Sequence, residues 1–158
     1  MSFVMLPEIS EAILRLRALR GKIFETLEGL DADALNWSPT DANTNSLFVL
    51  ATHCIGSEHG WMFETLGHGA KTRNRSAEFA ARASNLDALR AEYARVTQET
   101  ETLLATRSSD DLSRRRENAN FGPISERWII LHIIEHYAEH LGQMYLTKQL
   151  WEDSKIVR

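Results

Sequence analysis

The sequence predicts an all-α protein in which four long amphipathic helices form a bundle. Apolar residues recur at three- and four-residue intervals over four stretches, and Gly, Pro, Asp and Asn residues gather between them. No stretch alternates convincingly with a period of two, although residues 112–121 could contain a short extended piece. The 158 residues are enough for one well-buried core, so residues 1–158 are expected to form a single domain.

The first helix is expected over residues 7–30, where apolar residues mark one face. These residues are Ile9, Ile13, Leu16, Leu19, Ile23, Leu27 and Leu30. Pro7 suits the first turn, because a backbone N–H at that position would have no partner within the helix. Residues 31–44, with Pro39 and several Asp and Asn residues, break the period and predict a loop.

The second helix is expected from about residue 45 to residue 66, with Gly67 able to stop it. The link that follows, residues 67–84, exceeds the roughly 2–8 residues that usually join neighbouring antiparallel helices. We interpret this link as a crossover along the bundle, which would make the second and third helices parallel.

The third helix is expected over residues 86–103, with Ser84 and Asp87 as its capping pair. The fourth helix is expected to begin after Ser125, a candidate cap, and to continue to about Trp151 because nothing in between breaks it. This last helix is the most apolar of the four and carries three of the six histidines.

Composition excludes several classes of function. With 18 basic and 22 acidic residues, the formal net charge is -4, so nucleic-acid binding is not expected. The N-terminus lacks the pattern of a signal peptide and no apolar run approaches ~20 residues, which predicts a soluble, cytoplasmic protein without membrane contact. Cys54 is the only cysteine and its position predicts a small buried apolar residue, so any metal must rely on histidine and carboxylate ligands.

Three histidines of the fourth helix, His132, His136 and His140, are spaced four residues apart. A pair at this spacing can direct two imidazole nitrogens at one metal ion. At about 100° per residue, His136 and His140 border the apolar stripe of the helix, whereas His132 lies further round beside Glu135 and Glu139. The expected ligand pair is therefore His136 and His140, with His132 facing outward.

Two other metal motifs are rejected. Residues 132–136 match the inverted zincin motif H-x-x-E-H, but only 22 residues follow His136 and the distant acidic ligand of that motif is missing. A di-iron bundle needs Glu-x-x-His on two helices, which the sequence lacks. Taken alone, the histidine pair could also be a hydrogen-bonded or surface pair, so a third ligand is needed to favour a metal.

The second helix offers that third ligand. His53 lies about 60° round from Leu50, at the edge of the apolar face, where a ligand between two helices is expected. His59 lies on the opposite flank, and His68 falls beyond the expected end of the helix. By itself His53 could equally be a hydrogen-bonded histidine at a helix contact.

Several motifs together resemble the DinB/YfiT-like family of metalloenzymes. The matching segments are Thr44-Asn45-Ser46-Leu47 leading to His53, Gly56-Ser57-Glu58, residues 73–79, and residues 135–143 with H-x-x-x-H-x-G-Q. The likeness spans nearly the whole chain. It implies an up-down-down-up four-helix bundle with a long crossover between the second and third helices. It also implies a divalent metal, zinc or nickel, held by His53, His136 and His140.

The function expected from this site is that of a metal-dependent hydrolase or thiol-group transferase acting on a small molecule. Three imidazoles leave a position open for water or a thiolate. Gln143 could orient water or substrate, and Glu58 could act as a base if it reaches the cavity. Two alternatives are a binding module without turnover, which predicts a sealed site, and a helical dimer whose histidines are structural and do not converge.

Two groups of residues expected at the surface allow more than one interpretation. Lys71, Arg73 and Arg75 in the long link are more typical of solvated loop charge than of an anion site. Residues Trp128, Leu146 and Leu150 form a second apolar row on the fourth helix, which predicts burial within the chain or against a second copy in a homodimer.

Overall fold

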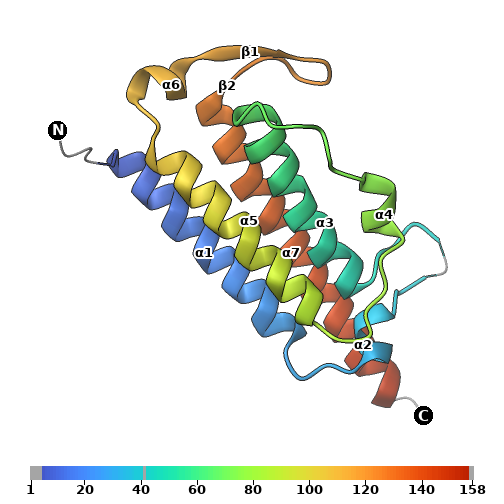
Figure 1. The fold of residues 1–158 in the computed structure, drawn as a ribbon. Coiled ribbons are helices and arrows are strands. Elements are labelled where there is room, and N and C mark those ends of the chain that lie inside the picture. Colours follow the sequence, from blue (N-terminus) through green and yellow to red (C-terminus); the bar gives the residue numbers. More distant parts are fainter. Residues whose placement is uncertain (1–4, 41, 157–158) are drawn as a thin grey trace.

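The protein is described by a computed structural model that covers residues 5–40 and 42–156. The described chain is mostly helical and has one small two-stranded sheet. Four long helices lie side by side (Figure 1). Their bounds are α1 (Pro7–Leu27), α3 (Leu47–His59), α5 (Asp87–Ala105) and α7 (Glu126–Ile156).

The second predicted helix is present, but it changes type before it ends. Ser46 begins α3 by accepting a hydrogen bond from the Val49 backbone N–H at 3.2 Å. After α3, the chain continues as a π-helix, η1 (Gly60–Leu66), which the apolar period did not reveal. The Thr65 hydroxyl donates to the Gly60 carbonyl five residues earlier, at 3.0 Å, and so follows the wider turn. Short π-helical segments often accompany functional sites.

The predicted loop over residues 31–44 is partly wrong, because it contains the short helix α2 (Ala32–Asn36). Asp31 caps it by accepting from the Ala34 N–H at 2.9 Å, which satisfies one of the free donors of its first turn. The Asn36 side chain then exchanges two hydrogen bonds of 2.8 Å with the backbone of Ala83, which fastens α2 to the end of the long link. The link itself contains α4 (Arg75–Phe79).

The residues that begin α5 and α7 can be compared with the predicted capping residues. The Ser84–Asp87 capping pair is wrong: Leu86 occupies the cap position of α5, and the side chain of Asn85 accepts from the Asp87 N–H instead. Ser125 is confirmed as the residue that precedes α7, since its hydroxyl accepts from the Trp128 N–H at 3.1 Å. The helix α7 continues to Ile156, beyond the predicted end.

A short helix and a hairpin connect α5 to α7. The helix α6 (Ser109–Ser113) precedes strands β1 (Arg115–Asn118) and β2 (Gly122–Ser125), which pair antiparallel with Arg115 opposite Ser125. The extended piece expected within residues 112–121 corresponds to β1, while β2 lies outside that range. Figure 1 shows the hairpin at the end of the helices where α7 begins.

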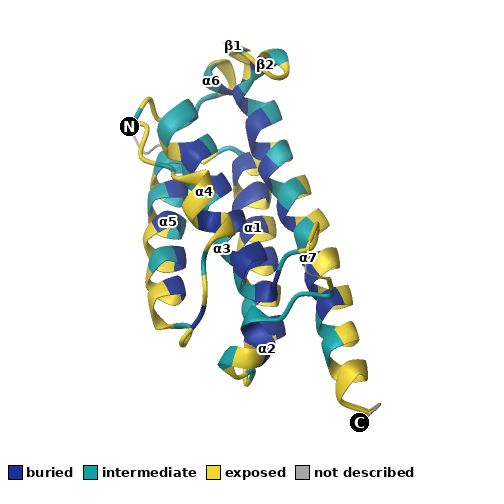
Figure 2. Ribbon diagram, turned by 90° about the vertical axis from the view of Figure 1, so that its right-hand side faces the viewer, coloured by how far each residue is buried: buried dark blue, intermediate teal, exposed yellow. Residues whose placement is uncertain are grey.

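The core lies between the long helices, whose facing sides are buried (Figure 2). At its centre is a group of four polar side chains, one from each long helix, which we call the polar node: Arg20, Glu58, Thr100 and Tyr137. Glu58 forms an ion pair with Arg20 and accepts from the hydroxyls of Thr100 at 2.6 Å and Tyr137 at 2.7 Å. A buried carboxylate is stable here because its hydrogen-bonding capacity is largely satisfied.

No helix within the described ranges is long and apolar enough to cross a bilayer.

Candidate metal centre

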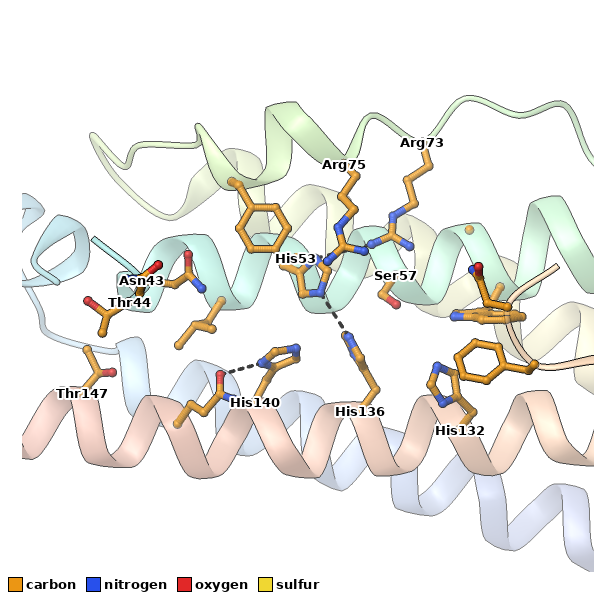
Figure 3. A pocket seen from close by; sticks show the side chains of 18 of the residues that line it. Asn43, Thr44, His53, Ser57, Arg73, Arg75, His132, His136, His140 and Thr147 are labelled. Carbon is orange, nitrogen blue, oxygen red and sulfur yellow. Dashed lines mark hydrogen bonds between the residues drawn. The ribbon is translucent and has the colours of Figure 1, made fainter. Parts of the chain in front are cut away.

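Three histidines from two helices converge at one point. His53 comes from α3, and His136 and His140 come from α7; one nitrogen from each lies within 4.8 Å of the others. The Nε2 atoms of His53 and His136 are 3.2 Å apart. Figure 3 shows the His53 ring directed from α3 toward the two rings of α7. The expectation that these histidines are structural and do not converge is therefore wrong.

The ring of His53 is held by Glu78, the last-but-one residue of α4. Its Nδ1 lies 2.8 Å from a Glu78 carboxylate oxygen. Because a carboxylate only accepts, Nδ1 carries the proton and Nε2 keeps its lone pair for the convergence point. Arg73 binds both oxygens of the same carboxylate, at 2.7 and 3.0 Å. Arg73 is thus part of the site and not the solvated loop charge that the sequence predicted.

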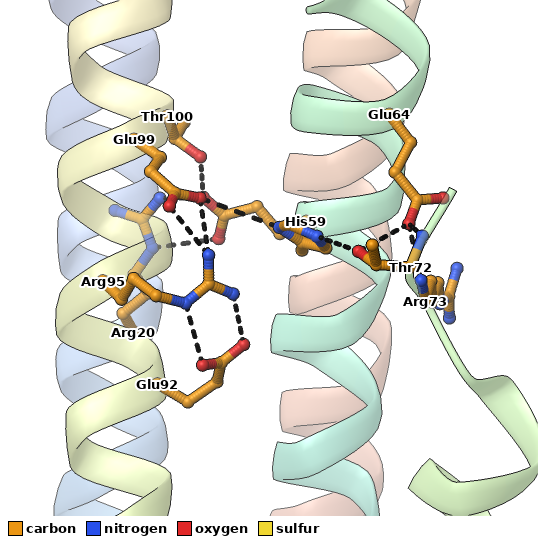
Figure 4. Close-up of polar contacts among 10 residues, drawn as sticks. Arg20, His59, Glu64, Thr72, Arg73, Glu92, Arg95, Glu99 and Thr100 are labelled. Carbon is orange, nitrogen blue, oxygen red and sulfur yellow. Dashed lines mark hydrogen bonds and ion pairs between the residues drawn. The ribbon is translucent and has the colours of Figure 1, made fainter. Parts of the chain in front are cut away.

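The loop that carries Arg73 is fixed by Glu64 of η1. One carboxylate oxygen of Glu64 accepts from the backbone N–H groups of both Thr72 and Arg73 (Figure 4). These backbone donors outweigh the effect of burial and lower the pKa of Glu64. The Nε2 atom of His59 lies 3.1 Å from the hydroxyl of Thr72, so His59 contacts the same loop. The π-helix therefore positions the loop, and the loop positions Glu78.

Two glycines on α3 and η1 make room for these side chains. A Cβ atom at Gly56 would lie 2.2 Å from the nearest Glu78 oxygen, and one at Gly60 would lie 2.8 Å from Arg73 Cδ. Either methyl group would displace its neighbour, so the four-residue glycine spacing lets the carboxylate and the guanidinium lie against the helix.

The second ligand helix supplies its own hydrogen bond. His140 Nδ1 donates to the Gln143 side-chain oxygen at 2.8 Å, which leaves His140 Nε2 without the proton. Gln143 thus lines the cavity beside the three histidines, and its contact is with a histidine. Outer hydrogen bonds of this kind fix the tautomer and orientation of metal-binding imidazoles.

Burial favours the neutral form of His53 and His136. Desolvation lowers the pKa of His136 to about 3, and repulsion from the neighbouring His140 and His53 rings adds to the effect. Desolvation also lowers the pKa of His53, although the Glu78 carboxylate opposes the shift. Glu78 stays ionised, because its bonds from Arg73 and His53 outweigh burial and lower its pKa. Neutral imidazoles are the form that binds a metal ion.

The donor set fits a divalent ion. Two nitrogens bound to a tetrahedral zinc-type ion at ~2.0–2.1 Å lie roughly 3.3 Å from each other, close to the 3.2 Å between the Nε2 atoms of His53 and His136. Imidazole nitrogens suit zinc, copper, iron and nickel. With three protein ligands, one coordination position would remain for water or substrate.

A cavity of about 960 Å³ adjoins the three histidines. Along α7 its wall includes, in order, His132, His136, His140 and Thr147 (Figure 3). His132 therefore faces the cavity, which contradicts the outward direction predicted from the sequence. Its ring stacks on the ring of Trp128 and does not extend into solvent. The cavity also contradicts the sealed site expected of a binding module without turnover.

Glu58 does not line this cavity. It belongs to the polar node, is completely buried, and is bound by Arg20, Thr100 and Tyr137. The condition for its role as a base, that it reach the cavity, is not met. Its place is explained by the helix period: it follows His53 by five residues and so turns toward the core.

Two residues that matter here were missed in the sequence. Arg20 occupies a position on the apolar face of α1, between Leu16 and Ile23. A charged residue on such a face signals a buried partner. Glu78 lies in the segment that resembles the DinB/YfiT-like family, and the Gly56–Gly60 spacing was the available sign that another segment approaches α3 closely.

Comparisons with known proteins agree with this architecture. A family model described as mycothiol-S-transferase matches residues 13–152. Among solved structures, the chain is similar to the crystal structure of a conserved protein from Enterococcus faecalis, with 16% sequence identity and a TM-score of 0.76. That match covers 89% of this chain and 95% of the other, and at this identity it shows the fold alone. No curated protein matches the sequence significantly.

Proposed function

The chain belongs to the mycothiol-S-transferase family, a DinB/YfiT-like family, and from this premise we propose that it is a metal-dependent thiol S-transferase acting on a small molecule. The convergence of His53, His136 and His140 beside an open cavity carries the proposal. These residues would hold a divalent ion, zinc or nickel. When bound, such an ion supplies a Lewis acid that favours the thiolate form of a thiol.

The family name suggests mycothiol as the thiol, and the cavity offers polar groups for such a molecule. Asn43 and Thr44 line the end of the cavity beyond His140 (Figure 3), and Arg75 also lines the cavity. Amide, hydroxyl and guanidinium groups can bind the hydroxyl, amide and carboxylate groups of a polar thiol. Gln143 holds His140 in place and borders the same space.

The proposed reaction joins the thiol sulfur to an electrophilic carbon of the second substrate. The S–H proton is released, a new S–C bond forms, and a leaving group departs with the electron pair of its bond to carbon. The role of this chain is to hold both molecules beside the histidines in the required orientation, which supplies a substantial part of the rate gain of a bimolecular transfer.

Hydrolysis is the second candidate, since three imidazoles with an open position are also typical of sites that activate water. The cavity favours either reaction over simple binding, because it gives a substrate access to the histidines. Thiol transfer is preferred on the family match.

The test combines metal content with transfer activity. Protein purified without a histidine tag should contain about one divalent ion per chain and should conjugate mycothiol to monochlorobimane. His136→Ala should lose both properties, while His68→Ala, a control at an exposed histidine outside the cluster, should keep both. Absence of a bound ion, with a Tm unchanged by added zinc or nickel, would refute the metal site. Equal transfer by wild type and His136→Ala would refute the reaction.

We also propose an up-down-down-up bundle and a homodimer. The direction of the chain in Figure 1 supports the first, since α1 and α7 run one way and α3 and α5 the other. Leu131 on α7, which is 59% exposed and lies outside the cavity, supports the second. Light scattering should give twice the mass of one chain, and Leu131→Glu should halve it; a monomeric wild type contradicts the dimer.

A further inference from the structure

One end of the cavity is formed by aromatic rings. Trp61 of η1, Phe121 of the turn between the strands, and His132 of α7 line it, and we call these three residues the aromatic wall. The centroid of the His132 ring lies 5.1 Å from that of Trp61 and 5.6 Å from that of Phe121. Trp128 stacks on His132 at 4.8 Å, with the two planes 10° apart, and so supports the wall.

Folding alone does not account for this arrangement. The three rings come from separate segments of the chain, and Phe121 remains 50% exposed at the tip of the hairpin. An aromatic ring with half its surface in water contributes little to the core, and a polar residue would serve a turn equally well. Large apolar groups that gather at the edge of a cavity are typical of ligand-binding surfaces.

The aromatic wall is next to the candidate metal centre. The centroid of the His132 ring lies 6.1 Å from that of His136, one helical turn further along α7. A planar molecule resting on the wall would therefore extend toward the histidines. The opposite end, beyond His140, carries the polar residues Asn43 and Thr44 together with the aliphatic Leu146 and Leu150, and it has, among the described residues, no aromatic ring comparable to the wall (Figure 3).

We propose that the aromatic wall binds the planar apolar part of the electrophilic substrate, so that the second substrate is an uncharged aromatic or conjugated compound. This inference rests on the proposed transferase function, since it assigns the second substrate of the same site. Aromatic faces attract planar rings in stacked or edge-on geometry, and each such contact adds to the effect of burying apolar area. The end that carries Asn43 and Thr44 is then left to the thiol.

Binding of an unreactive probe tests the wall separately from catalysis. Nitrobenzene is neutral and aromatic, and it quenches tryptophan fluorescence. Wild-type protein should show saturable quenching, and Phe121→Ala should weaken this binding roughly two- to tenfold, whereas Phe121→Tyr should restore it. Phe63→Ala is the matched control, because Phe63 is 39% exposed and lies outside the cavity.

A transfer assay adds the second measurement. Phe121→Ala should raise KM for 1-chloro-2,4-dinitrobenzene by a similar factor and leave KM for the thiol unchanged. Quenching that never saturates, or that weakens equally in Phe63→Ala and Phe121→Ala, overturns the aromatic wall as a binding site even if thiol transfer is observed. Saturable binding lost in Phe121→Ala, without any transfer, supports the wall and refutes the transferase function.

Discussion

Glu78→Gln is the substitution that most directly tests how the metal centre is built. Glutamine keeps the size of the side chain and can still accept from His53 Nδ1, but it removes the charge that makes this 2.8 Å bond strong. A hydrogen bond to a charged group contributes about 1.5–3 kcal/mol and one between neutral groups about 0.5–1.5 kcal/mol. The substitution therefore loses the difference, about 1–1.5 kcal/mol. This loss weakens zinc binding roughly 5- to 13-fold.

The assay is isothermal titration of zinc into metal-free, untagged protein, with a competing chelator of known affinity. Glu28→Gln is the control, because Glu28 forms an exposed ion pair with Arg90 outside the cavity. Circular dichroism of the metal-free proteins checks that the fold is retained. A Glu78→Gln affinity within twofold of wild type would show that the carboxylate does not support the ligand, and the account of His53 given above would be wrong.

Three further outcomes are expected. Gly56→Ala should weaken zinc binding about as much as Glu78→Gln, because its methyl group would lie 2.2 Å from the Glu78 carboxylate. The control Gly21→Ala has open space around the new methyl group and should bind zinc as tightly as wild type. Cys54 should react with Ellman's reagent only after denaturation, since burial and nearby carboxylates raise the pKa of its completely buried thiol; rapid reaction of native protein would contradict this. Glu58→Gln should lower the free energy of unfolding by about 3–5 kcal/mol, because it leaves a buried guanidinium unpaired; a urea titration showing less than about 1 kcal/mol would count against the node.

The positions of the long helices could be predicted because their apolar faces follow the helical period over many turns. The same period selected His136 and His140, since it fixes which residues on one helix share a face. It failed for His132, where the expected outward direction ignored an aromatic neighbour. A helical wheel contains no information on what packs against its edge, and here Trp128 keeps the ring at the cavity.

Features that depend on contacts between distant segments were not predictable in this way. The ion pair of Arg20 with Glu58 spans 38 residues, and the bond between His53 and Glu78 spans 25. Nothing in local spacing specifies either partner. The place of His53 itself was expected chiefly from the family resemblance, and the structure gives it a physical basis in Glu78 and Arg73.

The polar node has a consequence for how this protein can change. Glu58 lies five residues after His53 on α3, and Tyr137 is the residue after His136 on α7, so their bond ties the two ligand-bearing helices together along their length. A shift of one residue along a helix moves a ligand by about 1.5 Å, far more than the ±0.2 Å that metal–ligand distances tolerate. The hairpin that completes the aromatic end of the cavity contributes nothing to this tie. We therefore expect substitutions in the hairpin to alter substrate preference while the spacing of the three histidines is inherited intact.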